Sequence, residues 1–199
     1  MSIGMLRAIR YGALALIGGL ALMWAAVGLG WFAPLGELQH GASVVGAFRL
    51  TDQDGNAVTE RALLGRPAVV FFGFTYCPDV CPTTLTSMTA LLKALGGDAD
   101  RLGAYFVTVD PERDTAGALK TYLGSFDKRI RGLTGPADQI AAIARPLGVY
   151  FARSGPGGSY TMDHTASVFL LDADGRLHGT IAYGEDAAVA EAKVRALLR

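Results

Sequence analysis

The chain has 199 residues, and its 18 Lys and Arg are balanced by 18 Asp and Glu, so the formal net charge at neutral pH is zero. It therefore lacks the basic excess typical of nucleic-acid-binding domains, and we expect no nucleic-acid partner. The length suits one domain of ordinary size plus a short segment. Only 18% of residues are charged and the mean hydropathy is +0.31, which is high for a soluble domain.

The apolar excess lies near the N-terminus, where residues 11–36 carry no charged side chain. Such a stretch is long enough to cross a bilayer as a helix. We predict a single transmembrane anchor over residues 11–33, a linker over 34–43 and a domain over 44–199. The alternative is a cleaved signal peptide, whose apolar region usually runs about 7–15 residues, so the longer run here favours a retained anchor.

The charges that flank this anchor predict its orientation. Arg7 and Arg10 precede it, and Glu37 is the first charged residue after it. The positive-inside rule places residues 1–10 in the cytoplasm and the C-terminal domain across the membrane. No long Arg- and Ser-rich transit segment precedes the span, which favours a bacterial inner membrane with the domain in the periplasm.

Beyond the linker, hydrophobic periodicity predicts alternating strands and helices. The order and the crossover rule predict an α/β, thioredoxin-like domain whose mixed sheet is flanked by helices, with early strands parallel and the last antiparallel. The predicted elements are a hairpin at Asp54-Gly55, a buried strand over 67–75, a helix from near Pro82 to Leu95, a buried strand over 102–110, a helix over 115–126 capped by Asp114, a strand over 130–135, a helix over 137–148, a loop over 155–158, a hairpin at Asp174-Gly175 and a final helix over 186–199 with apolar positions Val189, Val194 and Leu197.

The only two cysteines, Cys77 and Cys81, are separated by three residues and followed by Pro82. Because proline is tolerated in the first helical turn, the helix is predicted to start near Pro82, where unpaired amides would stabilise a thiolate. A disulfide closing so short a loop removes little unfolded-state entropy, so a structural staple is disfavoured. A redox couple and a pair of metal ligands both remain open, and Asp79 between them is a turn residue or a docking contact.

A metal site here needs a third ligand, and the chain has three histidines. Soft thiolates select copper(I), zinc or iron–sulfur clusters, but two cysteines cannot hold a cluster and structural zinc needs four ligands. His40 is expected to be solvated and His178 to be half exposed in a hairpin. His164 lies at the entry to the strand expected beside the cysteine loop, so it is the predicted third ligand.

Three motifs, "FTYCPDVCPTTL", "VTVDPERDT" and "YTMDHTASVFLLDADG", resemble the Sco/SenC family of membrane-anchored copper proteins. The resemblance runs from about Val44 to the C-terminus. It implies one copper ion, as Cu(I) or Cu(II), bound through Cys77, Cys81 and His164. It also implies a role in assembling the binuclear copper centre of cytochrome c oxidase subunit II.

The same resemblance places a loop of Asp110, Pro111, Arg113 and Asp114 near the copper site. One interpretation gives this loop contacts behind the ligands or with a partner protein. The other treats it as a strand-to-helix turn with a capping aspartate.

Two functions follow from the cysteine pair. The first, which is favoured, is a copper metallochaperone, with other periplasmic copper chaperones or thiol reductases as further partners. The second is an exported thiol–disulfide oxidoreductase in which Cys77 and Cys81 form the catalytic dithiol and reduce cysteines of subunit II or another protein.

Overall fold

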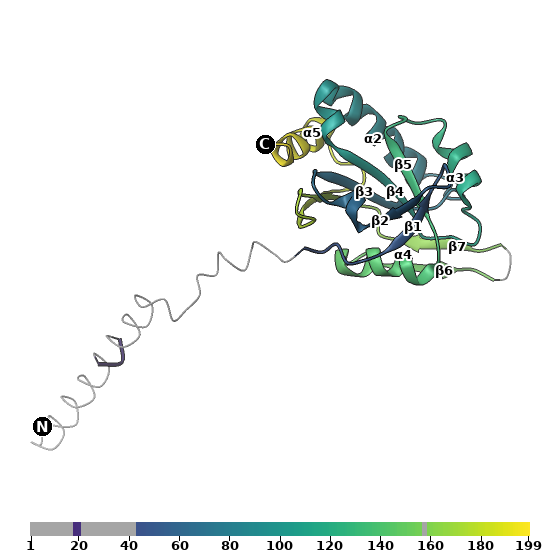
Figure 1. Ribbon diagram of the computed structural model, residues 1–199, viewed down its shortest axis with the longest axis horizontal. Helices are drawn as coiled ribbons and strands as arrows, with labels where there is room; N and C mark the ends of the chain where they lie inside the picture. The colour runs from purple at the N-terminus through teal and green to yellow at the C-terminus, as the bar shows by residue number, and fades with distance from the viewer. Residues whose placement is uncertain (1–17, 21–42, 157–158) are drawn as a thin grey trace, which may run out of the picture. The chain divides into compact units, whose positions relative to one another are not determined.

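The computed structural model describes residues 18–20, 43–156 and 159–199 (Figure 1). The chain divides into two units, Met1–His40 and Gly41–Arg199. In the first unit the description covers residues 18–20, which are helical, so the predicted anchor over 11–33 falls almost entirely outside the described residues. Within the described ranges, none of the helices combines the length and the hydropathy that a membrane span requires.

The second unit is built on one seven-stranded mixed sheet (Figure 1). Its central strands β3, β4 and β5 are parallel, whereas β8 runs antiparallel to β3 and β9 antiparallel to β8. The predicted mixed sheet and both predicted hairpins, β1–β2 and β8–β9, are confirmed. In sheet order the strands are β2 (Ala57–Thr59), β1 (Arg49–Asp52), β5 (Ile130–Thr134), β4 (Gly103–Thr108), β3 (Ala68–Gly73), β8 (Val168–Leu171) and β9 (Leu177–Ile181).

The centre of the sheet is buried on both faces because helices cover it on both sides. Every residue of β3 and β4 is buried, as expected for continuous apolar runs in parallel strands. Figure 1 shows α2 and α5 on one side of the sheet and α4 on the other. The helices are α2 (Val80–Leu95), α3 (Ala116–Leu123), α4 (Ala137–Ala144) and α5 (Ala187–Leu197), with short 3-10 turns η2 (Glu60–Leu63), η3 (Gly96–Arg101) and η4 (Arg145–Leu147).

The starts of two helices differ from the prediction. Helix α2 begins at Val80, so Pro82 occupies its third position, where a missing N–H costs nothing because first-turn amides have no partner within the helix. Helix α3 is capped by Thr115, whose hydroxyl accepts from the Ala118 amide at 3.2 Å. The predicted cap by Asp114 is wrong, since that side chain is completely buried.

Helix α5 has the predicted position, but one of its three expected apolar contacts is absent. Val194 and Leu197 are buried, whereas Val189 is 47% exposed. Val189 is wrongly predicted because helical periodicity does not show which apolar positions meet a neighbour.

The sequence did not predict a second, two-stranded sheet formed by β6 (Phe151–Ser154) and β7 (Thr161–His164). Both strands are short and only partly buried, so neither produces a clear hydrophobic alternation. The predicted glycine-rich loop lies in the connection between them, of which residues 157–158 are outside the described part.

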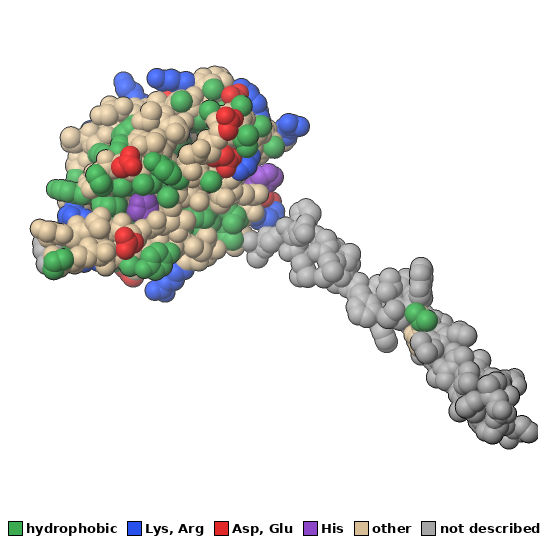
Figure 2. Space-filling view, turned by 180° about the vertical axis from the view of Figure 1, so that it is seen from behind, with side chains coloured by type: hydrophobic (Ala, Val, Ile, Leu, Met, Phe, Trp, Pro, Cys, Tyr) green, Lys and Arg blue, Asp and Glu red, His purple; other side chains and the backbone are tan. Residues whose placement is uncertain are grey.

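Charged side chains of both signs are distributed over the surface. Figure 2 shows acidic and basic groups interspersed on one face, between areas of hydrophobic side chains.

Asp52 stabilises the β1–β2 turn, and its isosteric replacement gives a test of the fold. Burial alone would raise the pKa of Asp52, but hydrogen bonds from Arg131, Asn56 and the Asp54 amide together lower it to about 2. Relative to the ordinary value of 3.8, this is about 2 kcal/mol of stability at neutral pH, fully present above pH 3.8 and lost as the pH falls through 2. We expect Asp52→Asn to lower the free energy of unfolding by about that amount at pH 7, and progressively less between pH 4 and 2, in urea titrations.

Asp54→Asn is the matched control in the same turn. Asp54 pairs with Lys120 at 2.9 Å, but both side chains are at least half exposed, and such pairs contribute little. Equal destabilisation by the two variants would contradict the assignment to Asp52.

Candidate metal centre

The structure brings Cys77, Cys81 and His164 together at one end of the sheet. Cys77 lies in the loop after β3, Cys81 in the first turn of α2 and His164 at the end of β7. Their three ligand atoms all lie within 4.8 Å of one another, and the Cys81 Sγ is 3.5 Å from the His164 Nε2. Both cysteines are free.

The amides of the two cysteines each donate a hydrogen bond that fixes the loop around them. The Cys77 amide donates to the Phe74 carbonyl at 3.3 Å, which turns the chain away from β3. The Cys81 amide, in the first turn of α2, donates to the Cys77 Sγ at 3.4 Å. An amide of the helix N-terminus therefore stabilises the sulfur of Cys77.

Cys81 has a different environment from the one that the sequence predicts. Its side chain is completely buried, and burial raises the pKa of the Cys81 thiol far above its usual value, so the predicted thiolate stabilisation at this position is wrong. Burial likewise raises the pKa of the nearby Tyr122, with Cys81 and Cys77 adding to the effect. Burial thus favours the neutral thiol of Cys81, which must lose its proton to bind a metal.

The imidazole of His164 is oriented by its neighbours. Its Nδ1 lies 3.0 Å from the Thr165 carbonyl, which can only accept, so Nδ1 carries the proton and the Nε2 lone pair faces Cys81. The rings of Phe71 and Phe74 pack against the imidazole at centroid distances of 6.1 and 5.8 Å. Burial lowers the pKa of His164, which favours the neutral form that binds metals.

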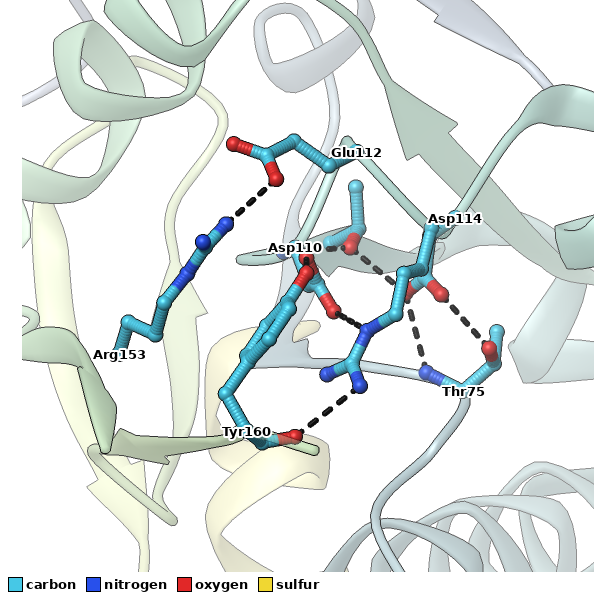
Figure 3. A network of polar contacts seen from close by, with 8 residues as sticks. Thr75, Asp110, Glu112, Asp114, Arg153 and Tyr160 are labelled. Atoms are coloured by element: carbon cyan, nitrogen blue, oxygen red, sulfur yellow. Dashed lines mark hydrogen bonds and ion pairs between the residues drawn. The ribbon is translucent and has the colours of Figure 1, made fainter. Parts of the chain in front are cut away.

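The loop from Asp110 to Asp114 connects this site to its surroundings. Arg113 forms an ion pair with Asp110 and donates to the Tyr160 carbonyl at 3.0 Å, and the Tyr160 hydroxyl donates to Asp110 at 2.8 Å (Figure 3). Asp114 accepts from both the amide and the hydroxyl of Thr75, two residues before Cys77. The loop is therefore a turn that also contacts Thr75 and Tyr160, which are near the cysteines and His164 in the sequence.

Two contributors, Tyr160 and Thr75, were not singled out from the sequence. Each lies inside one of the quoted motifs, but nothing in its local pattern predicts a long-range partner. Tyr160 meets Asp110 across 50 positions of sequence, and Thr75 meets Asp114 across 39.

The remaining candidates lie elsewhere or have a minor place. Asp79 is exposed at the N-cap position of α2, where its carboxylate accepts from the Thr83 hydroxyl at 3.4 Å without bonding a helix amide. His178 is exposed in β9 and is not part of the cluster. His40 lies outside the described residues.

Two sulfurs and one imidazole nitrogen form a soft, three-donor set. Among the described residues no further His, Cys, Asp or Glu joins this group, so the four protein ligands of a structural zinc site are not assembled. Thiolate and imidazole donors suit copper, and the number of donors is sufficient for Cu(I). The chemistry of the donor set therefore fits copper.

Comparison with known proteins identifies the family. The SCO1/SenC family model matches residues 36–199. The chain belongs to the SCO1/SenC family. It is 36% identical to the SCO2-like protein of Rickettsia conorii over 141 residues, which is 69% of each chain.

Solved structures of the family agree with this assignment and with the predicted thioredoxin-like fold. The copper-bound ScoI of Bradyrhizobium japonicum is 44% identical, with a TM-score of 0.72 over 77% of this chain and 98% of that one. The copper-bound yeast Sco1 is 34% identical, with a TM-score of 0.70 over 77% and 87% of the two chains.

Gly73 gives a test of how closely the Cys81 sulfur packs. A Cβ at Gly73 would lie 2.7 Å from the Cys81 Sγ and 2.8 Å from the Phe106 ring. We expect Gly73→Ala to reduce the free energy of unfolding by roughly 1–3 kcal/mol through overpacking, measured by urea titration. Gly179→Ala in β9 is the control because a Cβ there meets no atom within 4 Å; a cost as large as that of Gly73→Ala would contradict this explanation.

The unequal burial of the two thiols predicts unequal reactivity. Cys77 is partly exposed, whereas Cys81 is completely buried and burial raises its pKa. In the native reduced chain at neutral pH we expect iodoacetamide to label Cys77 first, and Cys81 only after unfolding or at alkaline pH. Peptide mass spectrometry measures both rates, and faster labelling of Cys81 would show that the burial does not hold in solution.

Proposed function

We propose that this protein is a copper metallochaperone that binds one copper ion through Cys77, Cys81 and His164. The observation that carries the proposal is the convergence of two free thiols and an oriented imidazole within 4.8 Å in a chain of the SCO1/SenC family. Relatives of the same fold are described with copper bound. The ion is the cargo of this site.

The geometry suits transfer of the ion. Cys77 and His164 are only partly buried, so a ligand of the recipient can reach the copper ion from their side of the site. Cys81, which is completely buried, would hold the ion from the protein interior. Three donors leave room for an incoming fourth, which permits ligand exchange without full release. Because both thiols must be deprotonated, copper affinity should fall as the pH is lowered.

The proposed recipient is the binuclear copper centre of cytochrome c oxidase subunit II. One structural relative is described as a member of the Sco family of cytochrome c oxidase assembly proteins. We further propose that residues 11–33 anchor the chain in a bacterial inner membrane, that 34–43 form a linker and that 44–199 carry the site in the periplasm. The uncharged stretch with Arg7 and Arg10 before it supports this topology.

Copper titration of the full-length reduced chain in detergent tests the function. In separate titrations we expect the same site to bind one equivalent of Cu(I) or one equivalent of Cu(II). Cys77→Ser and Cys81→Ser should each abolish both. In His164→Ala we expect Cu(II) affinity to fall sharply while disulfide formation persists, since soft Cu(I) is satisfied by two thiolates and Cu(II) needs the imidazole.

His178→Ala is the matched control because His178 is exposed in β9 and lies outside the cluster. It should titrate like the parent chain. Unchanged Cu(II) affinity in His164→Ala would refute the three-ligand site, and weak or non-stoichiometric binding by the parent chain would refute the chaperone.

A second function, reduction of protein disulfides, is favoured by the two free thiols and the partial exposure of Cys77. Cys77 would attack a target disulfide to form a mixed disulfide, and Cys81 would then displace the target, leaving a Cys77–Cys81 disulfide and a reduced dithiol in the target. Because burial raises the pKa of Cys81, little thiolate is available for the second step, in which Cys81 attacks the mixed disulfide. Rapid turnover that persists in His164→Ala would favour this reductase over the chaperone.

A further inference from the structure

His164 belongs to an element that is separate from the main sheet. The β6–β7 hairpin forms its own two-stranded sheet, in which Phe151 lies opposite His164 and Ser154 opposite Thr161. Neither strand takes part in the seven-stranded sheet, whose strand β3 leads into the cysteine loop. The position of the hairpin relative to the two sulfurs therefore depends on side-chain contacts and on its chain connections to η4 and β8.

One guanidinium group, that of Arg113, contacts side chains from both parts. The Arg113 Cζ lies 3.8 Å from the ring centroid of Tyr160 and 4.7 Å from that of Tyr76. Tyr76 immediately precedes Cys77, and Tyr160 immediately precedes β7. Cation–π contact on both rings joins the cysteine loop to the hairpin.

Polar contacts fix the guanidinium in this position. Its Nε is paired with Asp110, its Nη1 donates to the Tyr160 carbonyl at 3.0 Å, and the Tyr160 hydroxyl donates back to Asp110 at 2.8 Å (Figure 3). The three residues thus form a closed ring of contacts, and the Arg113 side chain is only 20% exposed. A planar fork that donates in two directions while it stacks is specific to arginine, and lysine cannot replace it.

We propose that Arg113 is a positioning residue that clamps β7 to the cysteine loop and thereby sets the His164 imidazole relative to the two sulfurs. Tyr160 immediately precedes β7 and His164 is its last residue, so fixing Tyr160 constrains the direction of the strand that carries the histidine. The inference rests on the proposed function, because the imidazole matters most for Cu(II). The clamp therefore supports binding of Cu(II) and has little influence on Cu(I), which the two thiolates hold.

Arg153 provides a matched control on the same ring. Its Cζ lies 3.9 Å from the Tyr160 centroid, almost the same distance as that of Arg113. Its ion-pair partner is Glu112, and both side chains are substantially exposed. It shares the stacking on Tyr160, but among the described residues it forms neither a cation–π contact nor a hydrogen bond with Tyr76.

The experiment compares Arg113→Gln with Arg153→Gln in the full-length reduced chain in detergent. For Arg113→Gln we expect a loss of roughly 10- to 100-fold in Cu(II) affinity, the usual effect of removing a group that orients a ligand. We also expect an altered thiolate-to-copper(II) charge-transfer spectrum and Cu(I) affinity equal to that of the parent within error. Arg153→Gln should match the parent in all three measurements.

Hydrogen exchange of the copper-free chain provides a readout that does not depend on the metal. Amides of β6 and β7 should exchange faster in Arg113→Gln than in the parent or in Arg153→Gln, while those of β3 and β4 stay unchanged. If Arg113→Gln does not fold, Tyr76→Leu replaces it in both experiments, because Tyr76 is 65% exposed and its removal leaves the core intact.

The proposal is overturned if the folded variant keeps the parent's Cu(II) affinity and spectrum, or if Cu(I) and Cu(II) affinities fall equally. A parent chain that binds no Cu(II) would refute the proposed function instead. The clamp would then be judged by hydrogen exchange alone, and equal exchange of β7 in parent and variant would refute it.

Discussion

The buried carboxylate of Asp114 is the contact on which the arrangement of the site depends. Its side chain has no exposed surface, and it accepts hydrogen bonds from the Thr75 amide, the Thr75 hydroxyl and the Thr108 hydroxyl. Its own carbonyl accepts from Thr134. Burial raises the pKa of Asp114, so the hydrogen bonds offset a substantial desolvation cost. These bonds tie the carboxyl ends of β3, β4 and β5 together, which fixes the start of the cysteine loop.

The three candidate ligands belong to two different parts of the fold. Cys81 is completely buried in the first turn of α2, and its sulfur packs closely against Gly73 of β3. His164 comes from a hairpin outside that sheet. The position of its imidazole depends on packing against the rings of Phe71 and Phe74 and on the contacts around Arg113. Cys81 is therefore part of the core, Cys77 packs against its edge, and the imidazole comes from a separate element. A two-part site of this kind lets the third donor differ in stability from the first two.

The sequence predicted those elements correctly that a local residue pattern determines by itself. The buried runs of β3 and β4, the turns at Gly55 and Gly175 and the cysteine spacing all act locally, and the order of elements then implied the mixed sheet. It failed where a role depends on distant partners. Asp114 is a residue type typical of helix N-caps and stands where a cap is expected. Only its hydrogen bond with Thr75, 39 positions away, shows that it links two loops in the interior. The pKa of Cys81 was predicted in the wrong direction because helix position is visible in the sequence but burial is not.

The two candidate functions use one state of the site in different ways. A Cys77–Cys81 disulfide and a bound copper ion consume the same two sulfurs, so each excludes the other. Both require the reduced dithiol, which is the state in which the cysteines are free here. From that state a reductase needs a reactive thiolate and a ready resolving partner, whereas a metal site needs a third donor aimed at the sulfurs. Burial raises the pKa of the Cys81 thiol, which either function must deprotonate, so it does not separate them. The Nε2 lone pair of His164 lies 3.5 Å from the Cys81 sulfur, so the third donor is already in place. The geometry around Cys81 therefore favours metal binding over disulfide exchange.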